Sequence, residues 1–370
     1  GGKLTKVSMG VKLGSVPPAE CDVWGLTSNF SQHRNVACML IRHLKSAGRP
    51  VIVGGSDAIA ESRVYLEAGA DAIVLDKSGA ANWAVIDALT GRTPRGALSG
   101  VLFRDGTTVA VRVRPQTPED WALPSPEVVR QTLGSEYWSA YFPDHLVPIG
   151  SVFTDIGCDR KCDFCQTPSY RLGYKAMSPE VAIRWLAAQR AGGAGSVIGS
   201  SDQFLARLLW DGGRDEVLEI MRGLRELGLA ILWANGLELR KATQGRGLVR
   251  EGTDLAPDEE LIRALWGWDG RAGCYHAFIP AERPLHGREN YAKLLPWREH
   301  RELLKAIVRA GVPTLTYGCI IGFEDDDDST LARLEEGVTE LHDELKAINP
   351  GLFFQIAPFS ISPIPGTPQG

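Results

Sequence analysis

Three cysteines are crowded into one short stretch of the chain. Cys158, Cys162 and Cys165 lie in the sequence TDIGCDRKCDFCQTPSYR, separated by three residues and then by two. Thiolates bind soft metal ions and iron–sulfur clusters, and the charged neighbours of these cysteines argue against a role in the core. A structural zinc site uses four ligands, commonly as two separated pairs, so zinc would require a distant fourth ligand here. We expect an iron–sulfur cluster, with zinc as the alternative.

Length and composition define the class of protein. The chain has 370 residues, of which 44% are hydrophobic and 23% charged, and its net charge is −5. A chain of this kind buries a large core, as two domains or as a barrel with a smaller unit. Charges form no long block apart from the acidic run at 324–329, so we expect no nucleic-acid partner.

The same sequence gives an expectation for the compartment. No apolar run is long enough to span a bilayer, so we expect no membrane association. The chain has seven cysteines, an odd number that makes a poor disulfide framework in a chain of this size. We therefore expect a reducing, cytoplasmic location.

Residues 1–95 alternate apolar strands with amphipathic helices. Strands are expected at 22–29, 50–57 and 70–76, with helices at 35–48 and 61–69. This alternation predicts an α/β domain with a doubly wound, Rossmann-like parallel sheet. Ligands of such sheets bind beyond the carboxyl ends of the strands, where Thr27, Ser28, Gly54 and Gly55 lie.

Two further segments complete the expected organisation. Residues 96–147 contain a pattern that predicts a hairpin turning at Asp105–Gly106, followed by a proline-broken connection. Residues 148–370 contain six strands with intervening helices, which predicts a partial (β/α)6 barrel. The three cysteines directly follow the first of these strands, at the end where barrel enzymes carry their catalytic groups.

The cysteine spacing, with Phe164 before the last cysteine, resembles the cluster loop of the radical S-adenosylmethionine (SAM) family. The resemblance implies a [4Fe-4S] cluster held by the three thiolates, with one open iron that binds SAM. It also implies SAM contacts at later strand ends, with the candidates Ser201, Asp202, Glu238 and Ile320. The alternatives are a helix N-cap for Ser201 and Asp202, a solvent-facing side chain or an iron ligand for Glu238, and core packing for Ile320.

The segments VWGLTSN and VIVGGSDA resemble two loops of the cobalamin-binding fold, and together with the barrel they resemble the cobalamin-binding radical SAM family. The resemblance implies that Thr27, Ser28, Gly54 and Gly55 approach the nucleotide tail of the corrinoid, since glycine lacks a Cβ atom. Arg63 is a candidate for the lower face of the cobalt, with an exposed helix arginine as the alternative. The Asp-x-His-x-x-Gly motif that supplies a histidine to cobalt in many cobalamin proteins is absent from the sequence.

The family resemblance implies a methyltransferase that moves a methyl group from SAM, via methylcobalamin, to a carbon of a small molecule in natural-product biosynthesis. It implies an electron donor such as flavodoxin or ferredoxin. Family members include an enzyme type that methylates tryptophan in thiopeptide antibiotic assembly. Aromatic residues near strand ends favour such a substrate, and core packing is their alternative: Trp233, Trp266, Trp268 and Tyr275.

Glu238 and Tyr275 are the candidate catalytic residues. Residues on or near the fourth strand of the barrel also qualify for substrate contact, namely His276, Glu282, Arg283 and Lys293, although solvated surface charge is the expected state of Arg283 and Lys293. Two rival functions are a cobalamin-dependent rearrangement without methylation and a non-catalytic module that binds a metal or a corrinoid.

Overall fold

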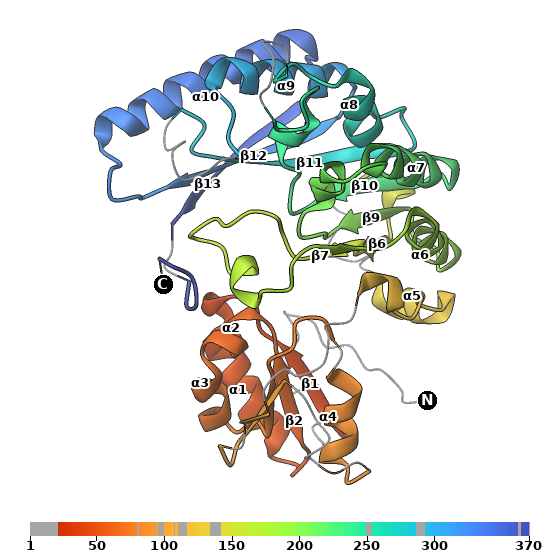
Figure 1. Ribbon diagram of the computed structural model, residues 1–370, viewed down its shortest axis with the longest axis vertical. Helices are drawn as coiled ribbons and strands as arrows, with labels where there is room; N and C mark the ends of the chain where they lie inside the picture. Colours follow the sequence, from red (N-terminus) through yellow and green to blue (C-terminus); the bar gives the residue numbers. More distant parts are fainter. Residues whose placement is uncertain are drawn as a thin grey trace. The chain divides into compact units, whose positions relative to one another are not determined.

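The chain forms two α/β units in a computed structural model (Figure 1). The structure describes residues 21–79, 81–92, 94, 100–106, 108–109, 117–133, 142–248, 254–285, 293–361 and 364–369. The first twenty residues of the predicted cobalamin domain, and parts of the predicted connection at 96–147, lie outside this range. The first unit comprises Gly1–Thr117, Asp163–Tyr170 and Pro363–Gly370, and the second comprises Pro118–Cys162 and Arg171–Ser362.

The sheet of the first unit has five strands that follow one another in chain order. They are β1 (Trp24–Thr27), β2 (Val51–Gly54), β3 (Ala72–Val74), β4 (Val101–Phe103) and β5 (Thr108–Val109). The first three are parallel, while β4 pairs antiparallel with β3 and with β5. The predicted hairpin at Asp105–Gly106 is therefore confirmed, and it extends the sheet of the first unit.

Helices cover both faces of this sheet. They are α1 (Arg34–Lys45), α2 (Ser56–Ala60), α3 (Ser62–Ala68) and α4 (Asn82–Leu89). Alternate residues of each strand pack on opposite faces of the sheet, because successive side chains of a strand point in opposite directions. Val53 packs with Ile41 and Tyr65 of α1 and α3, whereas Val74 packs with Val85 of α4.

The helices on both faces agree with the predicted doubly wound sheet, but the strand order differs from it. A doubly wound sheet reverses its strand order at one point, and among the described strands no such reversal occurs. The physical reason is that β4 enters the sheet through a short antiparallel hairpin, beside β3, instead of crossing over to the free edge of β1.

The second unit is built on six parallel strands, again in chain order. They are β6 (Ile149–Val152), β9 (Ser196–Gly199), β10 (Ala230–Trp233), β11 (Gly273–Glu282), β12 (Thr314–Ile321) and β13 (Phe353–Ser360). In the part of the chain that the structure describes, the outer strands β6 and β13 do not pair with each other, so the sheet is open. The six strands with intervening helices that the sequence predicts are thus present.

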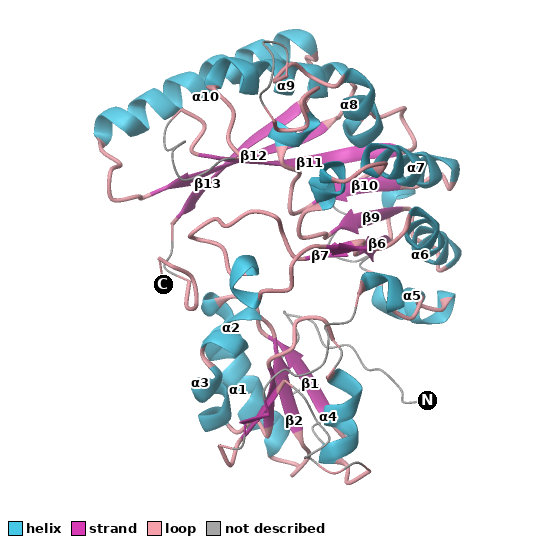
Figure 2. Cartoon of the chain, viewed as in Figure 1, coloured by secondary structure: helices cyan, strands magenta, loops and turns pink. Residues whose placement is uncertain are grey.

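Long helices pack on one side of this second sheet, as Figure 2 shows. They are α6 (Pro179–Ala191), α7 (Gly213–Glu226), α8 (Glu259–Trp266), α9 (Trp297–Arg309) and α10 (Asp328–Ile348), and the short helix α5 (Pro126–Thr132) precedes them. Local sequence explains where several begin. The side chain of Ser178 caps α6 just before a proline, that of Asp258 caps α8, and Asp327 forms a capping box with Thr330 on α10.

None of the described helices has both the length and the apolar character that crossing a membrane requires.

A buried histidine in the core of the second unit generates a prediction about stability. His300 of α9 shares a hydrogen bond of 2.8 Å with the hydroxyl of Tyr317, and burial lowers its pKa from 6.5 to about 4. The unfolded chain therefore binds this proton more tightly than the folded chain. The stability that neutral His300 contributes is complete above pH 6.5 and decreases as the pH falls towards 4. Between pH 7 and pH 5 we expect a loss of about 2 kcal/mol in unfolding free energy from this group.

The measurement is urea unfolding of the wild-type chain and of His300→Gln at both pH values. The glutamine can still bond to Tyr317 but does not titrate, so the variant should lose about 2 kcal/mol less than the wild type between pH 7 and pH 5. An identical pH dependence in the two proteins would contradict the assignment.

Candidate functional site

The cysteine loop begins at the carboxyl end of the first parallel strand of the second unit. After β6 the chain forms the short strand β7 (Asp155–Ile156), which pairs with β8 (Lys175–Ala176), and the loop runs from Gly157 to the 3-10 helix η7 (Thr167–Tyr170). None of Cys158, Cys162 and Cys165 is in a disulfide, and all three are partly buried. The position predicted for the three cysteines is confirmed.

The loop that follows β9 holds the start of the cysteine loop. Thr154 Oγ1 and Ser201 Oγ share a buried hydrogen bond of 2.9 Å, and the Gly157 N–H donates to Asp202 Oδ2 over 2.8 Å. Gly157 has a φ of +80°, and a Cβ atom there would lie 1.6 Å from the carbonyl oxygen of Gly173. Ser201 and Asp202 thus anchor the cysteine loop, and Gly157 is required for the chain to turn into it.

A buried carboxylate and a buried guanidinium strengthen the same connection. The Gln203 N–H donates to Asp155 Oδ1 over 3.0 Å, and Arg207 donates to the carbonyls of Met177 and Thr154. Asp155 and Arg207 are fully buried. Burial raises the pKa of Asp155, against the hydrogen bond from Gln203 and the charge of Arg207, which lower it.

Glu238 lies beyond the end of β10, at the centre of a charged network. Its side chain is 2% exposed and forms ion pairs with Arg160 and, over 3.0 Å, with Lys241. Gln203 Nε2 donates to Glu238 Oε2 over 3.1 Å, and Lys241 Nζ also bonds to Asp159 Oδ1 over 2.6 Å. Asp159 and Arg160 belong to the cysteine loop, so this network fixes the loop to the sheet edge. Glu238 faces the protein interior and not solvent.

Of this network, only Glu238 is among the candidate residues from the sequence; Arg160, Lys241, Gln203 and Asp159 are not. Lys241 lies on the 3-10 helix η9 (Leu239–Ala242), three residues after Glu238, and its side chain is fully buried. Burial lowers the pKa of Arg160, but the hydrogen bond and charge of Glu238 outweigh burial and raise it overall. The signal available in the sequence was the pair of opposite charges, Asp159 and Arg160, between the first two cysteines.

The expectation that Lys293 and Arg283 are solvated surface charges is wrong. Lys293 pairs with Glu282 at the end of β11, and Arg283 pairs with Asp326 over 2.7 Å. Burial lowers the pKa of Lys293, but the negative charges of Glu282 and of the Cys162 thiolate outweigh burial and raise it overall. Partner carboxylates at the strand ends explain why both cations are retained inside the fold.

Tyr275 and most of the predicted aromatic residues lie away from this edge. Tyr275 is the third residue of β11, so it lies at the amino end of the strand, and its ring contacts Trp268 with centroids 5.4 Å apart. Trp266 is fully buried in the core, and Trp233 donates its indole N–H to the Leu265 carbonyl. Tyr275 and Trp268 lie away from the cysteine loop, because strand direction places the start of β11 at the opposite edge. Trp233 ends β10 at the carboxyl edge, but its ring packs in the core against Phe204.

The first unit has its own candidate site, where β1 and β2 end. The Ser28 N–H donates to the Gly54 carbonyl over 2.9 Å, and the Asn29 side chain accepts from the Ser56 N–H at the start of α2 over 3.1 Å. Gly55 has a φ of +100°, and a Cβ atom there would lie 2.4 Å from the carbonyl oxygen of Ser28. Ser28 is buried and Thr27 is exposed. The two loops form one cradle that only glycine at position 55 allows.

The two remaining residues that were predicted to contact cofactors, Arg63 and Ile320, differ in exposure and position. Arg63 lies on α3 with its side chain 90% exposed, where it pairs with Glu67 one turn away. This is the exposed helix arginine that the sequence offered as the alternative. Ile320 is the penultimate residue of β12 and is half-buried, at the carboxyl end of its strand.

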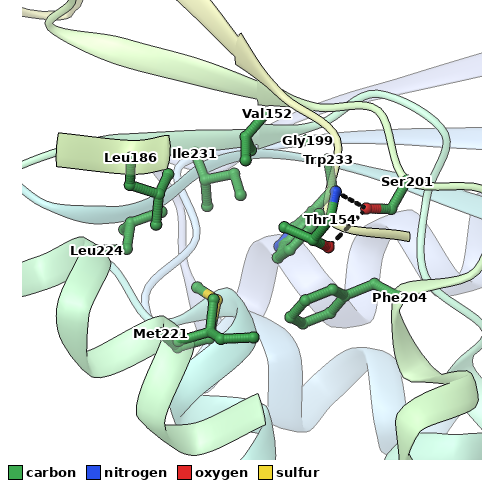
Figure 3. Close-up of a pocket in the computed structure, with 11 residues that line it drawn as sticks. Val152, Thr154, Leu186, Gly199, Ser201, Phe204, Met221, Leu224, Ile231 and Trp233 are labelled. Carbon is green, nitrogen blue, oxygen red and sulfur yellow. Dashed lines mark hydrogen bonds between the residues drawn. The ribbon is translucent and has the colours of Figure 1, made fainter. Parts of the chain in front are cut away.

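A small cavity lies beneath the cysteine-loop anchor (Figure 3). Phe204, Met221 and Trp233 are among its lining residues, and the hydrogen bond between Thr154 and Ser201 closes one side. Its volume is about 10 Å³, which is room for one water molecule at most. This cavity therefore belongs to the core and is too small to hold a cofactor.

The donor set of the cysteine loop suits a cluster. Among the described residues, no three His, Cys, Asp or Glu side chains are gathered around one point as a single metal ion requires. A four-iron cluster makes a different demand, because each thiolate binds a different iron. Cys158, Cys162 and Cys165 lie on one loop, whose first part is anchored through Gly157, Asp159 and Arg160, and they are the donors that would hold such a cluster.

Comparison with known proteins identifies the fold. No family model and no curated protein sequence matches the chain. A solved structure of the radical SAM methyltransferase TsrM from Kitasatospora setae, with cobalamin and a [4Fe-4S] cluster bound, superposes at a TM-score of 0.65. The chain has the fold of a cobalamin-dependent radical SAM enzyme. The sequence identity is 15%, over 97% of this chain and 65% of that one.

Two further structures show the same fold. TsrM with tryptophan substrate and a SAM analogue bound also superposes at 0.65, with 14% identity. OxsB, a cobalamin-dependent SAM radical enzyme solved with aqua-cobalamin and SAM, superposes at 0.63 with 16% identity, over 96% of this chain and 52% of that one. The cobalamin-dependent radical SAM fold thus extends over both units, while the chain spans about half to two thirds of the length of these proteins.

The network around Glu238 predicts a large effect of a single substitution. Lys241→Met removes the buried cation that neutralises Glu238 and Asp159, so we expect the unfolding free energy to fall by about 3 kcal/mol. Urea unfolding measures the change. Arg63→Met, which breaks an exposed ion pair, is the control and should have little effect. Equal effects of the two substitutions would show that the network does not stabilise the loop.

Proposed function

We propose that the protein is a member of the cobalamin-dependent radical SAM family that transfers a methyl group from SAM, through cobalamin, to a carbon of a small molecule. The observation that carries the proposal is the position of Cys158, Cys162 and Cys165. They lie on one loop that begins at the carboxyl edge of a parallel sheet, in a chain with the fold of cobalamin-dependent radical SAM enzymes. The cofactors are a [4Fe-4S] cluster, SAM and cobalamin.

The residues around the cysteine loop have defined tasks in this proposal. A bound [4Fe-4S] cluster supplies an open iron for SAM and the electron that cleaves its carbon–sulfur bond. The three thiolates would hold the cluster. Asp202 orients the backbone that leads into Cys158, while Lys241 and Arg160 keep the loop against Glu238.

Side chains at the neighbouring strand ends are candidates for SAM. Glu238 and Asp202 are carboxylates at the carboxyl edge, and Ile320 offers an apolar surface at the end of β12. Glu238 is the candidate catalytic residue that lies at this edge, and Tyr275 is not, since it lies at the amino end of β11. We assign Ser201 an anchoring role through Thr154.

The cradle of the first unit is the proposed cobalamin site. Cobalamin supplies a cobalt centre that accepts and donates a methyl group. The nucleotide tail of the corrinoid would lie beside Thr27 and Ser28, along the backbone of Gly54 and Gly55, where glycine at position 55 lets the two loops meet. Arg63 has no part in this site, since its side chain extends into solvent and pairs with Glu67.

The substrate class follows from the likeness to TsrM, whose solved structure holds tryptophan. We propose a small-molecule substrate in natural-product biosynthesis, with tryptophan as the first candidate and a flavodoxin or ferredoxin as the electron donor. The choice of tryptophan as substrate rests on that likeness alone. The aromatic residues Trp233 and Trp266 do not support it, because both are buried in the core.

Anaerobic reconstitution with iron and sulfide tests the cluster. The wild-type chain should bind about four irons and turn brown, and Cys158→Ala, Cys162→Ala and Cys165→Ala should each lose most of this iron. Cys21→Ala is the matched control, because Cys21 is also a free, partly buried cysteine. Zinc in place of iron in the purified and reconstituted chain would refute the proposal.

Product analysis tests the reaction. We expect the reconstituted chain, incubated with cobalamin, SAM, a reductant and tryptophan, to yield a product that has one methyl group in place of a hydrogen. Cys158→Ala should yield none, because SAM would lack its iron. Mass spectrometry distinguishes the outcomes: a product of unchanged mass would contradict methyl transfer and favour a rearrangement, and activity retained by Cys158→Ala would contradict a catalytic cluster.

A further inference from the structure

A chain of hydrogen bonds connects four side chains beneath the cradle of the first unit. Ser28 Oγ lies 2.8 Å from the hydroxyl of Tyr65, and that hydroxyl bonds to Asp57 Oδ2. Arg34 makes two bonds to the same carboxylate, from Nη2 to Oδ1 over 2.7 Å and from Nε to Oδ2 over 2.9 Å. We call Ser28, Tyr65, Asp57 and Arg34 the Ser28 relay. Its members come from the β1–α1 loop, α3, α2 and α1.

The hydrogen bonds of the Ser28 relay can be donated in only one direction. Asp57 paired with Arg34 is a carboxylate, which only accepts hydrogen bonds, so Tyr65 must donate to it. The oxygen of Tyr65 then accepts from Ser28, whose single proton points inward. Burial and the bond to Asp57 raise the pKa of Tyr65 to about 12, so the phenol keeps its proton at neutral pH.

The consequence concerns the hydroxyl of Ser28. Its proton is used by Tyr65, and among the described residues its oxygen makes no other hydrogen bond. Ser28 can therefore only accept from a ligand. The backbone carbonyl of the same residue accepts from the Asp57 N–H over 3.1 Å and lies against Gly55, so the relay is attached directly to the cradle.

Joining the two loops of the cradle does not require these buried side chains. Tyr65 is fully buried, Asp57 is 2% exposed and Ser28 is 3% exposed, and burying a charge costs free energy unless it is paired. Backbone bonds already join the two loops, from Ser28 to Gly54 and from Asp57 to Ser28. The side-chain relay adds to these bonds a fixed orientation of one hydroxyl at the cradle.

We propose that Tyr65, Asp57 and Arg34 are positioning residues that hold Ser28 as a hydrogen-bond acceptor for a hydroxyl group on the nucleotide tail of the corrinoid. The inference rests on the proposed function, since it assigns a role within the same cobalamin site. Ribose hydroxyls of the tail are donors of the kind that such an acceptor selects. Tyr65→Phe would leave the Ser28 proton without its inward acceptor, and the hydroxyl would no longer be restricted to accepting.

Binding of two corrinoids tests this inference without any turnover. The reconstituted chain is titrated with hydroxocobalamin and with dicyanocobinamide, which lacks the nucleotide tail, and free corrinoid is measured by equilibrium dialysis. Tyr65→Phe should weaken cobalamin binding about fivefold, the value of one neutral hydrogen bond, and leave cobinamide binding unchanged. Tyr317→Phe, which removes an equally buried hydroxyl in the second unit, should change neither.

A double-mutant cycle distinguishes positioning from general stability. Ser28→Ala should weaken cobalamin binding as much as Tyr65→Phe does, and adding Tyr65→Phe to Ser28→Ala should cause no further loss. Ser28→Ala keeps all charges of the relay, so it tests the contact even if Tyr65→Phe does not fold. Unchanged cobalamin binding, or an equal loss for both corrinoids, would overturn the inference. A wild-type chain that binds neither corrinoid would instead refute the proposed cobalamin site itself.

Discussion

The ion-pair network of Glu238, Lys241 and Asp159 is the interaction on which the cysteine loop depends. Lys241 is fully buried, and it bonds at once to a carboxylate beyond β10 and to a carboxylate inside the loop. Charges in such a place are costly unless they neutralise one another, so the loop has one favourable position against the sheet edge. The anchor from Asp202 to Gly157 acts on the same loop from β9. The part of the loop that carries Cys158 is thereby held firmly against the sheet edge.

The two units share a device, although their sheets differ. In each, a buried carboxylate at the carboxyl ends of parallel strands is neutralised by a cation and fixes a loop. Asp57 and Arg34 do this in the first unit, and Glu238 and Arg160 do it in the second. Parallel strands direct their loops to one edge, which explains why chemistry-bearing residues from distant parts of the sequence gather there. In the proposed function, one edge serves cobalamin and the other serves the cluster and SAM.

Sequence reasoning recovers features that are local in the chain. Alternating apolar strands and amphipathic helices predict both α/β units, and the spacing of Cys158, Cys162 and Cys165 predicts their common loop. It does not predict ion pairs between residues that are distant in sequence. Arg160 and Glu238 are 78 residues apart, and neither local sequence indicates that the two side chains form an ion pair. Strand boundaries matter as well, because Tyr275 appears near a strand end but lies at the wrong end of β11. Pairing order also escapes periodicity: the hairpin at Asp105–Gly106 was predicted, but its antiparallel pairing with β3 in the sheet of the first unit was not.

The central claim is that the three thiolates leave one iron of a [4Fe-4S] cluster open for SAM. The most direct test is electron paramagnetic resonance of the reconstituted, chemically reduced chain with and without SAM, at a cobalamin-free stage. The account predicts the signal of a reduced four-iron cluster that changes when SAM is added, and that is absent from Cys162→Ala. A cluster signal that SAM leaves unchanged would contradict the account, because it would show that no iron is available to the cofactor.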